Sequence, residues 1–357
     1  MRECDVLVVG LGPAGARAAT EAARAGRRVI ALERKKTVGI PVQCAEFIPM
    51  PLGGLAKGEA RAQGVSAMAT FLPSGAKAER GFGGVMIRRD KFDQALAREA
   101  GEAGAVLWTD ASLRAIDPVR RVVMASTAGG LREVRYRALV AADGPLSQVA
   151  ACLGLPRLPV VTTRQYTVPL KRAHRDTDIW LSPDYPGGYA WLFPKGEFAN
   201  LGLGLDPRFE TDMKAPLDAL HAALVAEGRV GDEVLLRTGG PIPVGGLREH
   251  LVVGDVAFAG DAAGFTHPVS GAGIAPAVAS GERLGRAAAD YVRGELDALR
   301  HYEDEMREQF EPSLARGLAA RARMESAWRD RSHDDAAHRG GWIAFDEYYT
   351  APQGGRA

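Results

Sequence analysis

The sequence has few cysteines, no long apolar run and almost no net charge. Cys4, Cys44 and Cys152 are the only cysteines among 357 residues, and their spacing forms neither a disulfide framework nor a metal-ligand cluster. No apolar stretch reaches the roughly 20 residues that cross a bilayer. The formal net charge of +1 provides no strongly basic surface for nucleic acid. These absences predict a protein of a reducing compartment with no metal site, no membrane-spanning segment and no nucleic-acid partner.

The remaining composition is that of an ordinary globular protein. Hydrophobic residues make up 46% and charged residues 25% of a chain that is long enough for about two domains. The N-terminal run "MRECDVLVVG" has neither the basic flank nor the cleavage site of a signal peptide. We therefore expect a cytoplasmic protein, and peripheral contact with a membrane surface stays open.

Residues 5–33 have the pattern of a βαβ unit. A short β-branched run is followed by "GLGPAG", an alanine-rich helical stretch and a second apolar run that ends at Glu33. Gly10, Gly12 and Gly15 fit the G-x-G-x-x-G fingerprint, whose glycines allow a tight turn, approach of a pyrophosphate and close helix–strand packing. Glu33 stands where a carboxylate accepts ribose hydrogen bonds, although alone it also fits a solvated charge at a strand end. The whole unit predicts dinucleotide binding.

A second glycine-rich segment, "FAGDAAGFTHPVSGAGI", begins at residue 258. Its pattern predicts a strand that delivers Asp261 to a turn, followed by glycine-rich chain that opens a helix. Asp261 is placed to accept hydrogen bonds from a ribityl chain. The backbone of Gly271, Gly273 and Ile274 would bring a helix N-terminus against a flavin ring. The segment alone also fits a strand–turn–helix with Asp261 as N-cap, but together with the first motif it predicts FAD.

Large rings occupy every second position of "GGYAWLFPKGEF". Alternate residues of a strand point to one face, so Tyr189, Trp191 and Phe193 share a face, and Pro194 closes the run. Two interpretations are open at this point. The rings belong either to a core strand or to the apolar wall of a substrate pocket.

Strand-like and helical runs alternate along the chain without an internal repeat. They predict an α/β fold: a Rossmann-like FAD-binding domain on a parallel sheet, interleaved with an antiparallel-sheet substrate domain and followed by a C-terminal helical segment. We assign residues 1–65, 85–158 and 245–300 to the FAD-binding domain, 66–84 and 159–244 to the substrate domain, and 301–357 to the helical segment and tail.

Several motifs together resemble a known superfamily. "VVGLGPAG", "ALER", "RRDKFDQAL", "AADG" and "FAGDAAGFTHPVSGAGI" are similar to flavoprotein monooxygenases and reductases with the glutathione-reductase-type FAD fold. Within that superfamily, "VGIPVQCAE" and "YAWLFP" resemble the geranylgeranyl reductase branch, whose members saturate isoprenoid chains. The resemblance implies FAD as cofactor and NAD(P)H or a reduced electron carrier as external reductant. It also favours the pocket-wall interpretation of the aromatic run.

The resemblance assigns residues to parts of the cofactor. Phe47 stands where the branch often has glycine, and its ring is expected to narrow or reshape the pocket, which argues against a long isoprenoid. The adenosine half of FAD is assigned to Ala14, Gly15, Glu33, Arg34 and Leu113, the polar middle to Arg89, and the ribityl and ring portion to Cys44, Ala45, Asp261, Gly271, Gly273 and Ile274.

The implied activity is reduction of carbon–carbon double bonds in a hydrophobic, prenyl-like substrate. Reduced flavin gives the hydride, and the proton comes from water or from a side chain, with Cys44 and His267 as candidates. Cys44 also fits a small buried hydrophobe, and His267 a loop histidine with a structural hydrogen bond. Two alternatives remain: a flavin-dependent monooxygenase of a small hydrophobic or aromatic substrate, and a non-catalytic or electron-transfer flavoprotein.

Overall fold

The apolar run near the N-terminus forms strand β2 (Val6–Val9), which is buried along its whole length. A strand covered on both faces is typical of the middle of a parallel sheet. The computed structural model describes residues 1–50 and 52–350. In it, β2 belongs to a six-stranded sheet of order β18-β19-β11-β2-β3-β7, parallel except at the edge strand β18. The other strands are β3 (Val29–Leu32), β7 (Val106–Trp108), β11 (Ala138–Ala141), β18 (Val252–Val253) and β19 (Val256–Phe258).

A smaller sheet of four strands lies beside the parallel sheet. Its order is β1-β10-β9-β8, with antiparallel pairing except between β1 and β10. The strands are β1 (Arg2–Glu3), β8 (Ser112–Asp117), β9 (Val122–Thr127) and β10 (Gly130–Arg135). The short strands of residues 106–135 are therefore divided between two sheets, because β7 pairs in the parallel sheet.

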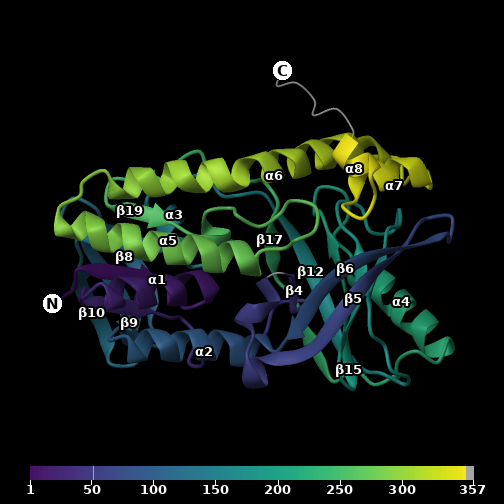
Figure 1. The fold of residues 1–357 in the computed structure, drawn as a ribbon, viewed down its shortest axis with the longest axis horizontal. Coiled ribbons are helices and arrows are strands. Elements are labelled where there is room, and N and C mark those ends of the chain that lie inside the picture. The colour runs from purple at the N-terminus through teal and green to yellow at the C-terminus, as the bar shows by residue number, and fades with distance from the viewer. Residues whose placement is uncertain (51, 351–357) are drawn as a thin grey trace.

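The third sheet has nine strands and occupies the other end of the molecule (Figure 1). Its order is β16-β12-β15-β14-β13-β5-β6-β4, with β17 also paired to β12. The pairing is antiparallel except between β13 and β5. The strands are β4 (Phe47–Pro49), β5 (Arg61–Phe71), β6 (Lys77–Ile87), β12 (Val160–Pro169), β13 (Thr177–Trp180), β14 (Ala190–Lys195), β15 (Phe198–Leu205), β16 (Leu236–Thr238) and β17 (Pro241–Pro243).

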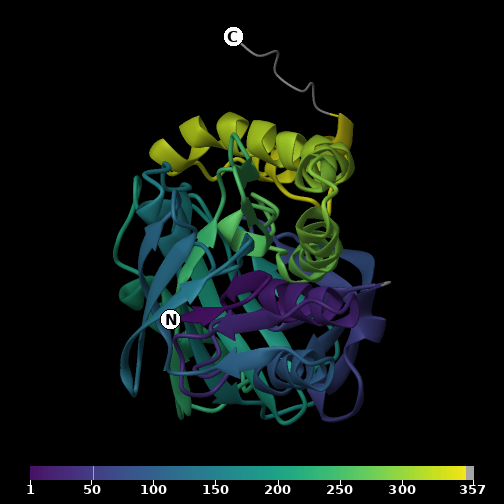
Figure 2. The same cartoon turned by 90° about the vertical axis from the view of Figure 1, so that its left-hand side faces the viewer.

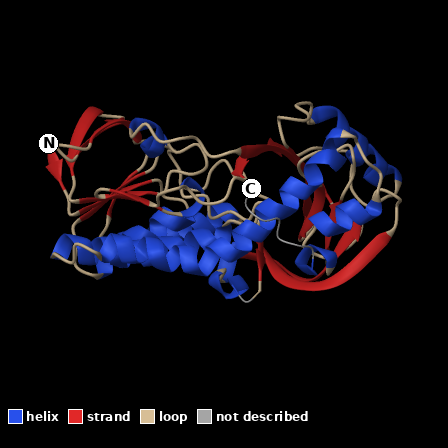
Figure 3. Ribbon diagram, turned by 90° about the horizontal axis from the view of Figure 1, so that it is seen from above, coloured by secondary structure: helices blue, strands red, loops and turns tan. Residues whose placement is uncertain are grey.

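Helices line one side of the parallel sheet, as the view from above shows (Figure 3). Glycines let two of them approach closely, because a Cβ at Gly281 would lie 2.1 Å from the Ala14 oxygen and one at Gly285 would lie 2.5 Å from the Ala18 oxygen. The α-helices of the whole described chain are α1 (Pro13–Arg24), α2 (Arg89–Glu102), α3 (Gln148–Cys152), α4 (Lys214–Ala226), α5 (Ile274–Arg293), α6 (Ala298–Arg329), α7 (Asp335–Gly341) and α8 (Glu347–Thr350), of which α4 packs on the nine-stranded sheet.

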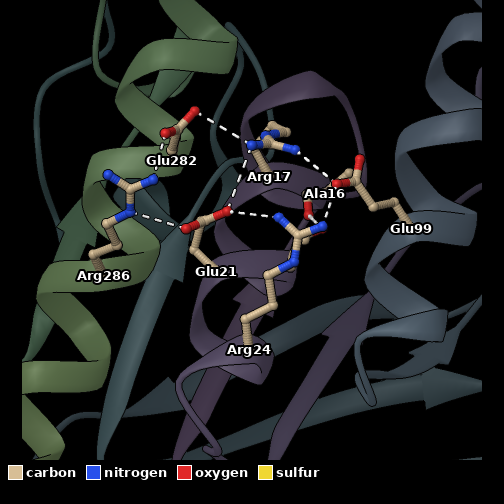
Figure 4. A network of polar contacts seen from close by, with 8 residues as sticks. Ala16, Arg17, Glu21, Arg24, Glu99, Glu282 and Arg286 are labelled. Carbon is tan, nitrogen blue, oxygen red and sulfur yellow. Dashed lines mark hydrogen bonds and ion pairs between the residues drawn. The ribbon is translucent and has the colours of Figure 1, made fainter.

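Charged side chains tie α1, α2 and α5 together (Figure 4). The Arg17 guanidinium of α1 lies 3.1 Å from Glu99 of α2 and 3.3 Å from Glu282 of α5. Glu21 of α1 accepts a hydrogen bond from Arg286 of α5 at 2.9 Å. Arg17 and Glu21 have little solvent exposure, so this network is screened less than isolated surface pairs are. It fixes the relative positions of three helices around the first glycine motif.

Helix α6 runs along the top of the molecule from the parallel-sheet end to the nine-stranded end, where α7 and α8 follow (Figures 1 and 2). Its early residues Leu299, Tyr302 and Met306 belong to the core around the parallel sheet. Near its other end, Arg321 bonds Asp206, which directly follows β15 of the large sheet. One helix therefore contacts both sheet-based parts of the protein.

The predicted α/β fold is confirmed. The predicted domain boundaries stay a prediction, but strand pairing adds detail to them. β4 and the whole of β5 and β6 pair within the nine-stranded sheet, so that sheet draws on residues 47–87 beyond the predicted 66–84. Of the predicted C-terminal segment, residues 351–357 lie outside the described residues.

Candidate active site

The three fingerprint glycines have different surroundings. Gly10 has φ of +96°, and a Cβ there would lie 2.3 Å from the backbone oxygen of Ala142. A Cβ at Gly15 would lie 1.9 Å from the Gly10 oxygen, so only glycine permits this close packing of helix on turn. A Cβ at Gly12 would meet nothing within 4 Å. Gly12 is the N-cap of α1 and no side chain caps the helix, so its first N–H groups face open space suited to a phosphate.

Glu33 is a buried, hydrogen-bonded carboxylate rather than a solvated charge. It follows β3, and its two oxygens accept the backbone N–H groups of Leu11 and Lys35, each at 2.9 Å. The N–H of Ala111 donates to the Glu33 carbonyl at 2.9 Å, which brings the neighbouring Leu113 of β8 to the same place. Arg34 is exposed. Glu33 and Leu113 are therefore brought together at the edge of the sheet beside α1.

The second motif lies beside the first because β19 and β2 flank β11 in the parallel sheet. Asp261 follows β19 and accepts the Thr266 hydroxyl at 2.6 Å. Burial raises the pKa of the Asp261 carboxyl, and the Thr266 hydrogen bond and the Arg89 charge oppose this shift. Gly273 is the N-cap of α5 without a side-chain cap, and Gly271 has φ of +68°. The N-terminus of α5 thus opens beside Asp261.

Cys44 and Ala45 lie between the parallel sheet and the large sheet. The Cys44 carbonyl accepts Gln165 Nε2 at 3.1 Å, and the Ala45 carbonyl accepts Asn200 Nδ2 at 3.2 Å. Burial raises the pKa of the Cys44 thiol, while the nearby positive charge of Arg89 lowers it. The Arg89 guanidinium forms two hydrogen bonds of 2.9 Å to Asp93, one turn further along α2. The charge of Arg89 therefore favours the ionised forms of both Cys44 and Asp261.

Glu46 is a site residue that sequence reasoning missed. Its side chain is buried, and its φ of +70° is unusual for a residue with a side chain. One carboxylate oxygen accepts the Arg89 N–H at 2.8 Å, and the other accepts Asn200 Nδ2 at 2.9 Å and forms an ion pair with Lys195. Glu46 therefore connects the start of α2 with strands β14 and β15. Its position directly after Cys44 and Ala45, in "QCAE", was the available signal.

Trp191 and Phe193 of the aromatic run lie on one face of β14, and Tyr189 directly precedes the strand. Trp191 and Phe193 are buried in an apolar cluster that also contains the partly buried Tyr189. Leu192, between them, points to the opposite face and joins the core under α4. Trp191 Nε1 donates to Gln165 Oε1 at 3.1 Å, and Gln165 in turn donates to the Cys44 carbonyl. The Gln165 side chain thus links the aromatic face to residues 44–46, the Cys44 segment.

Phe47 lies within the same aromatic cluster. Its ring centroid is 5.9 Å from those of Phe82 and Phe193. The ring lies over Gly84, where a Cβ would be 2.3 Å from Phe47 atoms. Phe47 therefore extends the ring surface from β14 toward β6, and its predicted narrowing effect on the pocket remains a prediction.

The C-terminal segment covers the aromatic face, which sequence reasoning also missed. Trp342 packs on Tyr189 with ring centroids 4.7 Å apart, and Phe345 joins the same cluster. The buried Trp342 Nε1 has no hydrogen-bond partner among the described residues. Asp335 bonds both the N–H and the hydroxyl of Ser74 at the tip of the β5–β6 hairpin. The signal available in the sequence was the three-residue spacing of Trp342, Phe345 and Tyr348.

His267 has both ring nitrogens engaged. Its Nδ1 accepts the backbone N–H groups of Val269 at 3.3 Å and Ser270 at 3.2 Å, which leaves the proton of the neutral ring on Nε2. Nε2 lies 3.2 Å from the Tyr348 hydroxyl of α8. Burial lowers the pKa of His267 to about 4, and the charge of Arg316 adds to the shift. The ring is therefore neutral at pH 7 and joins its loop to the C-terminal segment.

The residues present fit FAD. Two helix N-termini without side-chain caps, at Gly12 and Gly273, open at one edge of the parallel sheet. The space in front of Gly12 would accept a pyrophosphate, and the Asp261 oxygens are suited to the hydroxyls of a ribityl chain. This set of donors and acceptors matches a long, doubly anionic cofactor that carries a polyol.

Two family models match the chain. The FAD binding domain model matches residues 5–47, and the geranylgeranyl reductase catalytic domain model matches residues 160–239. The first range holds the glycine fingerprint and Glu33, and the second holds the aromatic strand. FAD as cofactor is thereby confirmed. Within the described part of the chain, no helix is both long and apolar enough to cross a membrane.

Similar proteins span almost the whole chain. Digeranylgeranylglycerophospholipid reductase 1 of Methanopyrus kandleri is 36% identical over 332 residues, covering 86% of this chain and 87% of that protein. The crystal structure of a geranylgeranyl bacteriochlorophyll reductase-like protein from Thermoplasma acidophilum is 25% identical, with a TM-score of 0.87 and coverage of 97% and 93%. The flavin-dependent halogenase CmlS is 18% identical, with a TM-score of 0.74 and coverage of 97% and 71%, so it shares the fold alone.

Proposed function

We propose, because the chain belongs to the geranylgeranyl reductase family, that its substrate is a glycerophospholipid with geranylgeranyl chains. As a member of that family the protein is an FAD-dependent oxidoreductase that reduces carbon–carbon double bonds of a prenyl-type substrate. The relative from Methanopyrus kandleri is named for such a lipid. The observation that carries the proposal is the aromatic face of β14. Trp191 and Phe193 lie on this face. Gln165 connects the face to Cys44, because it bonds both Trp191 and the Cys44 carbonyl.

The chain's own residues bind and orient the reactants in this proposal. Gly12 and the N-terminus of α1 receive the pyrophosphate, while Asp261 and the N-terminus of α5 hold the ribityl and ring portion. When bound and reduced, FAD supplies the hydride that an alkene carbon accepts. The aromatic face of β14 holds the apolar chain and excludes water. Glu46 holds the Cys44 segment beside β14 through its contacts with Asn200 and Lys195.

Cys44 is the better placed of the two proton-donor candidates. Burial raises the pKa of its thiol, so the group stays protonated at neutral pH and has a proton to give. The positive charge of Arg89 favours the thiolate that remains after the transfer. His267 is already held by Val269, Ser270 and Tyr348, and its proton lies on the nitrogen that faces Tyr348.

The electron donor and the place of action are further parts of the proposal. NAD(P)H or a reduced carrier protein is proposed to reduce the flavin. A lipid substrate has to be taken from a bilayer, so we propose peripheral contact with the membrane surface by a protein that is otherwise cytoplasmic. The fold is shared with a halogenase, so the architecture alone does not separate reduction from oxygen chemistry.

The test is anaerobic reoxidation of the reduced holoenzyme. Protein reduced to the colourless flavin is mixed without oxygen with digeranylgeranylglyceryl phosphate, and flavin absorbance is followed. Recovery of the oxidised spectrum at a rate that depends on lipid concentration is the expected result. A spectrum that recovers only after oxygen is admitted would contradict reduction of the lipid. A lipid that has gained oxygen would then favour the monooxygenase, and an unchanged lipid would favour a non-catalytic flavoprotein.

A further inference from the structure

A large open cavity lies at one edge of the nine-stranded sheet, apart from the glycine motifs. Its volume is about 740 Å³, which falls in the range of small-molecule sites. It is lined by residues of β5 and β6, of the short helical turn at Leu52–Leu55 and of the loop at 173–175. Its described lining has two arginines and one histidine but no carboxylate.

The side chains of the two arginines, Arg61 and Arg175, have no ion-pair or hydrogen-bond partner among the described residues. Most arginines around the parallel sheet, by contrast, are paired with acidic side chains. Two unpaired guanidinium groups that line one cavity create a positive region there. A guanidinium favours the oxygens of a phosphate, which it binds with two parallel N–H groups.

The loop that carries Arg175 is held in place on both sides of that residue. The His174 carbonyl accepts Gln63 Nε2 at 2.8 Å, and the Asp176 carboxylate accepts the Ser66 hydroxyl and the Ala67 N–H at 2.9 Å each. All three partners belong to β5, the strand that begins at Arg61. The backbone positions of both arginines are therefore fixed relative to each other, which lowers the entropy cost of binding an anion between them.

Val65 belongs both to the cavity lining and to the apolar part of the site, where it packs in the cluster that contains Trp191 and Phe193. At the side of the cavity, Met50 is 58% exposed and Leu55 is 39% exposed, so apolar surface flanks the arginines. An elongated molecule with a phosphate at one end and a prenyl chain at the other matches this sequence of surfaces.

We propose that this cavity binds the headgroup phosphate of the prenyl lipid through Arg61 and Arg175, while the lipid chains extend past Val65 toward β14. The inference rests on the proposed function for the identity of the lipid. A phosphate of a nicotinamide dinucleotide shares the same chemistry. The lipid is favoured because the described lining contains no Phe, Tyr or Trp on which a base would stack, and because apolar side chains stand beside the arginines.

The test uses the double variant Arg61→Gln with Arg175→Gln and measures lipid binding to the oxidised holoenzyme by titration calorimetry. The probes are digeranylgeranylglyceryl phosphate and geranylgeraniol, in the same detergent micelles. The Kd for the phosphate lipid is expected to rise on the order of tenfold or more, because two charge-assisted contacts are lost. The Kd for geranylgeraniol is expected to stay within twofold. Arg172→Gln, on the same loop but outside the cavity lining, is the matched control and should match the wild type.

The outcomes separate this inference from the proposed function. If the double variant binds both lipids as the wild type does, or loses affinity for both equally, the headgroup site is refuted. This holds even when the wild-type enzyme reduces the double bonds of the lipid. A further outcome is that the affinity for the phosphate lipid depends on the arginines while the holoenzyme reduces the double bonds of neither lipid. In that case the headgroup site stands and the proposed function fails. NADPH is titrated in the same way, and a loss of affinity for NADPH without a loss for the phosphate lipid would assign the site to the nucleotide and overturn the inference. Arg61→Gln alone, with FAD content as a fold check, provides the second variant.

Discussion

Gly12 differs from Gly10 and Gly15 in what an added methyl group would meet. Its φ of −69° suits alanine, and the space beside it is open, whereas a Cβ at Gly15 would overlap the backbone of Gly10. Gly12→Ala is therefore expected to fold normally but to weaken FAD binding about tenfold or more, because the methyl group occupies the proposed position of the pyrophosphate.

The measurement for Gly12→Ala is the Kd of FAD for the apoprotein, with the melting temperature of that apoprotein as the control. Gly15→Ala provides the contrast, since it should lower the melting temperature of the apoprotein itself. Wild-type FAD affinity in Gly12→Ala would place the pyrophosphate elsewhere.

Glu46 is a buried carboxylate that bonds the start of α2 and strands β14 and β15. Glu46→Gln keeps a hydrogen-bonding side chain but leaves the Lys195 ammonium without its partner. Removal of one charge from a buried pair is expected to lower the free energy of unfolding by about 3 kcal/mol. Urea denaturation of the apoprotein measures this loss. Glu79→Gln, which breaks an exposed pair with Lys77, should cost less than about 1 kcal/mol, and an equally small loss at Glu46 would contradict the buried-pair role.

At the scale of elements, local patterns were enough for the parts that are close in sequence. The run over residues 5–33 predicted strand, turn, helix and strand, and β2, α1 and β3 follow that order. The turn after β19 was predicted in the same way from its glycines and Asp261. The fold class was therefore accessible from the sequence, because each βαβ unit carries its own periodicity and turn residues.

Contacts between distant segments were not accessible in this way. The partners of Glu46 come from α2, β14 and β15, and their approach depends on how the sheets are joined rather than on any local pattern. The same is true of the C-terminal cover over β14. Trp342 and Tyr189 are far apart in the sequence, and their contact depends on the path of α6 across the molecule. A single sequence carries no information on which distant residues come into contact.

The aromatic face of β14 permits a substitution that separates a pocket wall from a core strand. Trp191→Ala is expected to cost about 3–5 kcal/mol whether or not lipid touches the ring, because the ring is buried and lies over Gly202. Trp191→Phe is the sharper change, since it keeps a ring in the cluster but removes the hydrogen bond to Gln165.

A pocket wall predicts that Trp191→Phe lowers kcat/KM for the prenyl lipid at least fivefold while FAD content is retained and stability falls by only about 1 kcal/mol. Steady-state turnover and thermal melting measure the two effects. Phe198→Ala, an exposed ring on the adjacent β15, is the control and should change neither. Wild-type turnover in Trp191→Phe would identify the strand as core alone.

At the scale of the whole molecule, the Cys44 segment lies between two parts of the proposed active site. One is the FAD-binding edge of the parallel sheet, and the other is the aromatic face of β14. The Cys44 segment follows the first βαβ unit and leads into β4 of the large sheet. Helix α6 spans both parts (Figure 1), and Trp342 of the segment after it packs on the aromatic Tyr189. Such a site is enclosed by apolar side chains and offers few polar groups, which suits transfer of hydride to an alkene within a prenyl chain.

The mass of the product tests this account most directly. Holoenzyme, digeranylgeranylglyceryl phosphate and a reductant are incubated, and the extracted lipid is analysed by mass spectrometry, once without oxygen and once in air. Saturation predicts a gain of two hydrogen atoms for each double bond reduced, in both atmospheres. A gain of one oxygen atom, formed only in air, would contradict reduction and identify the protein as a monooxygenase.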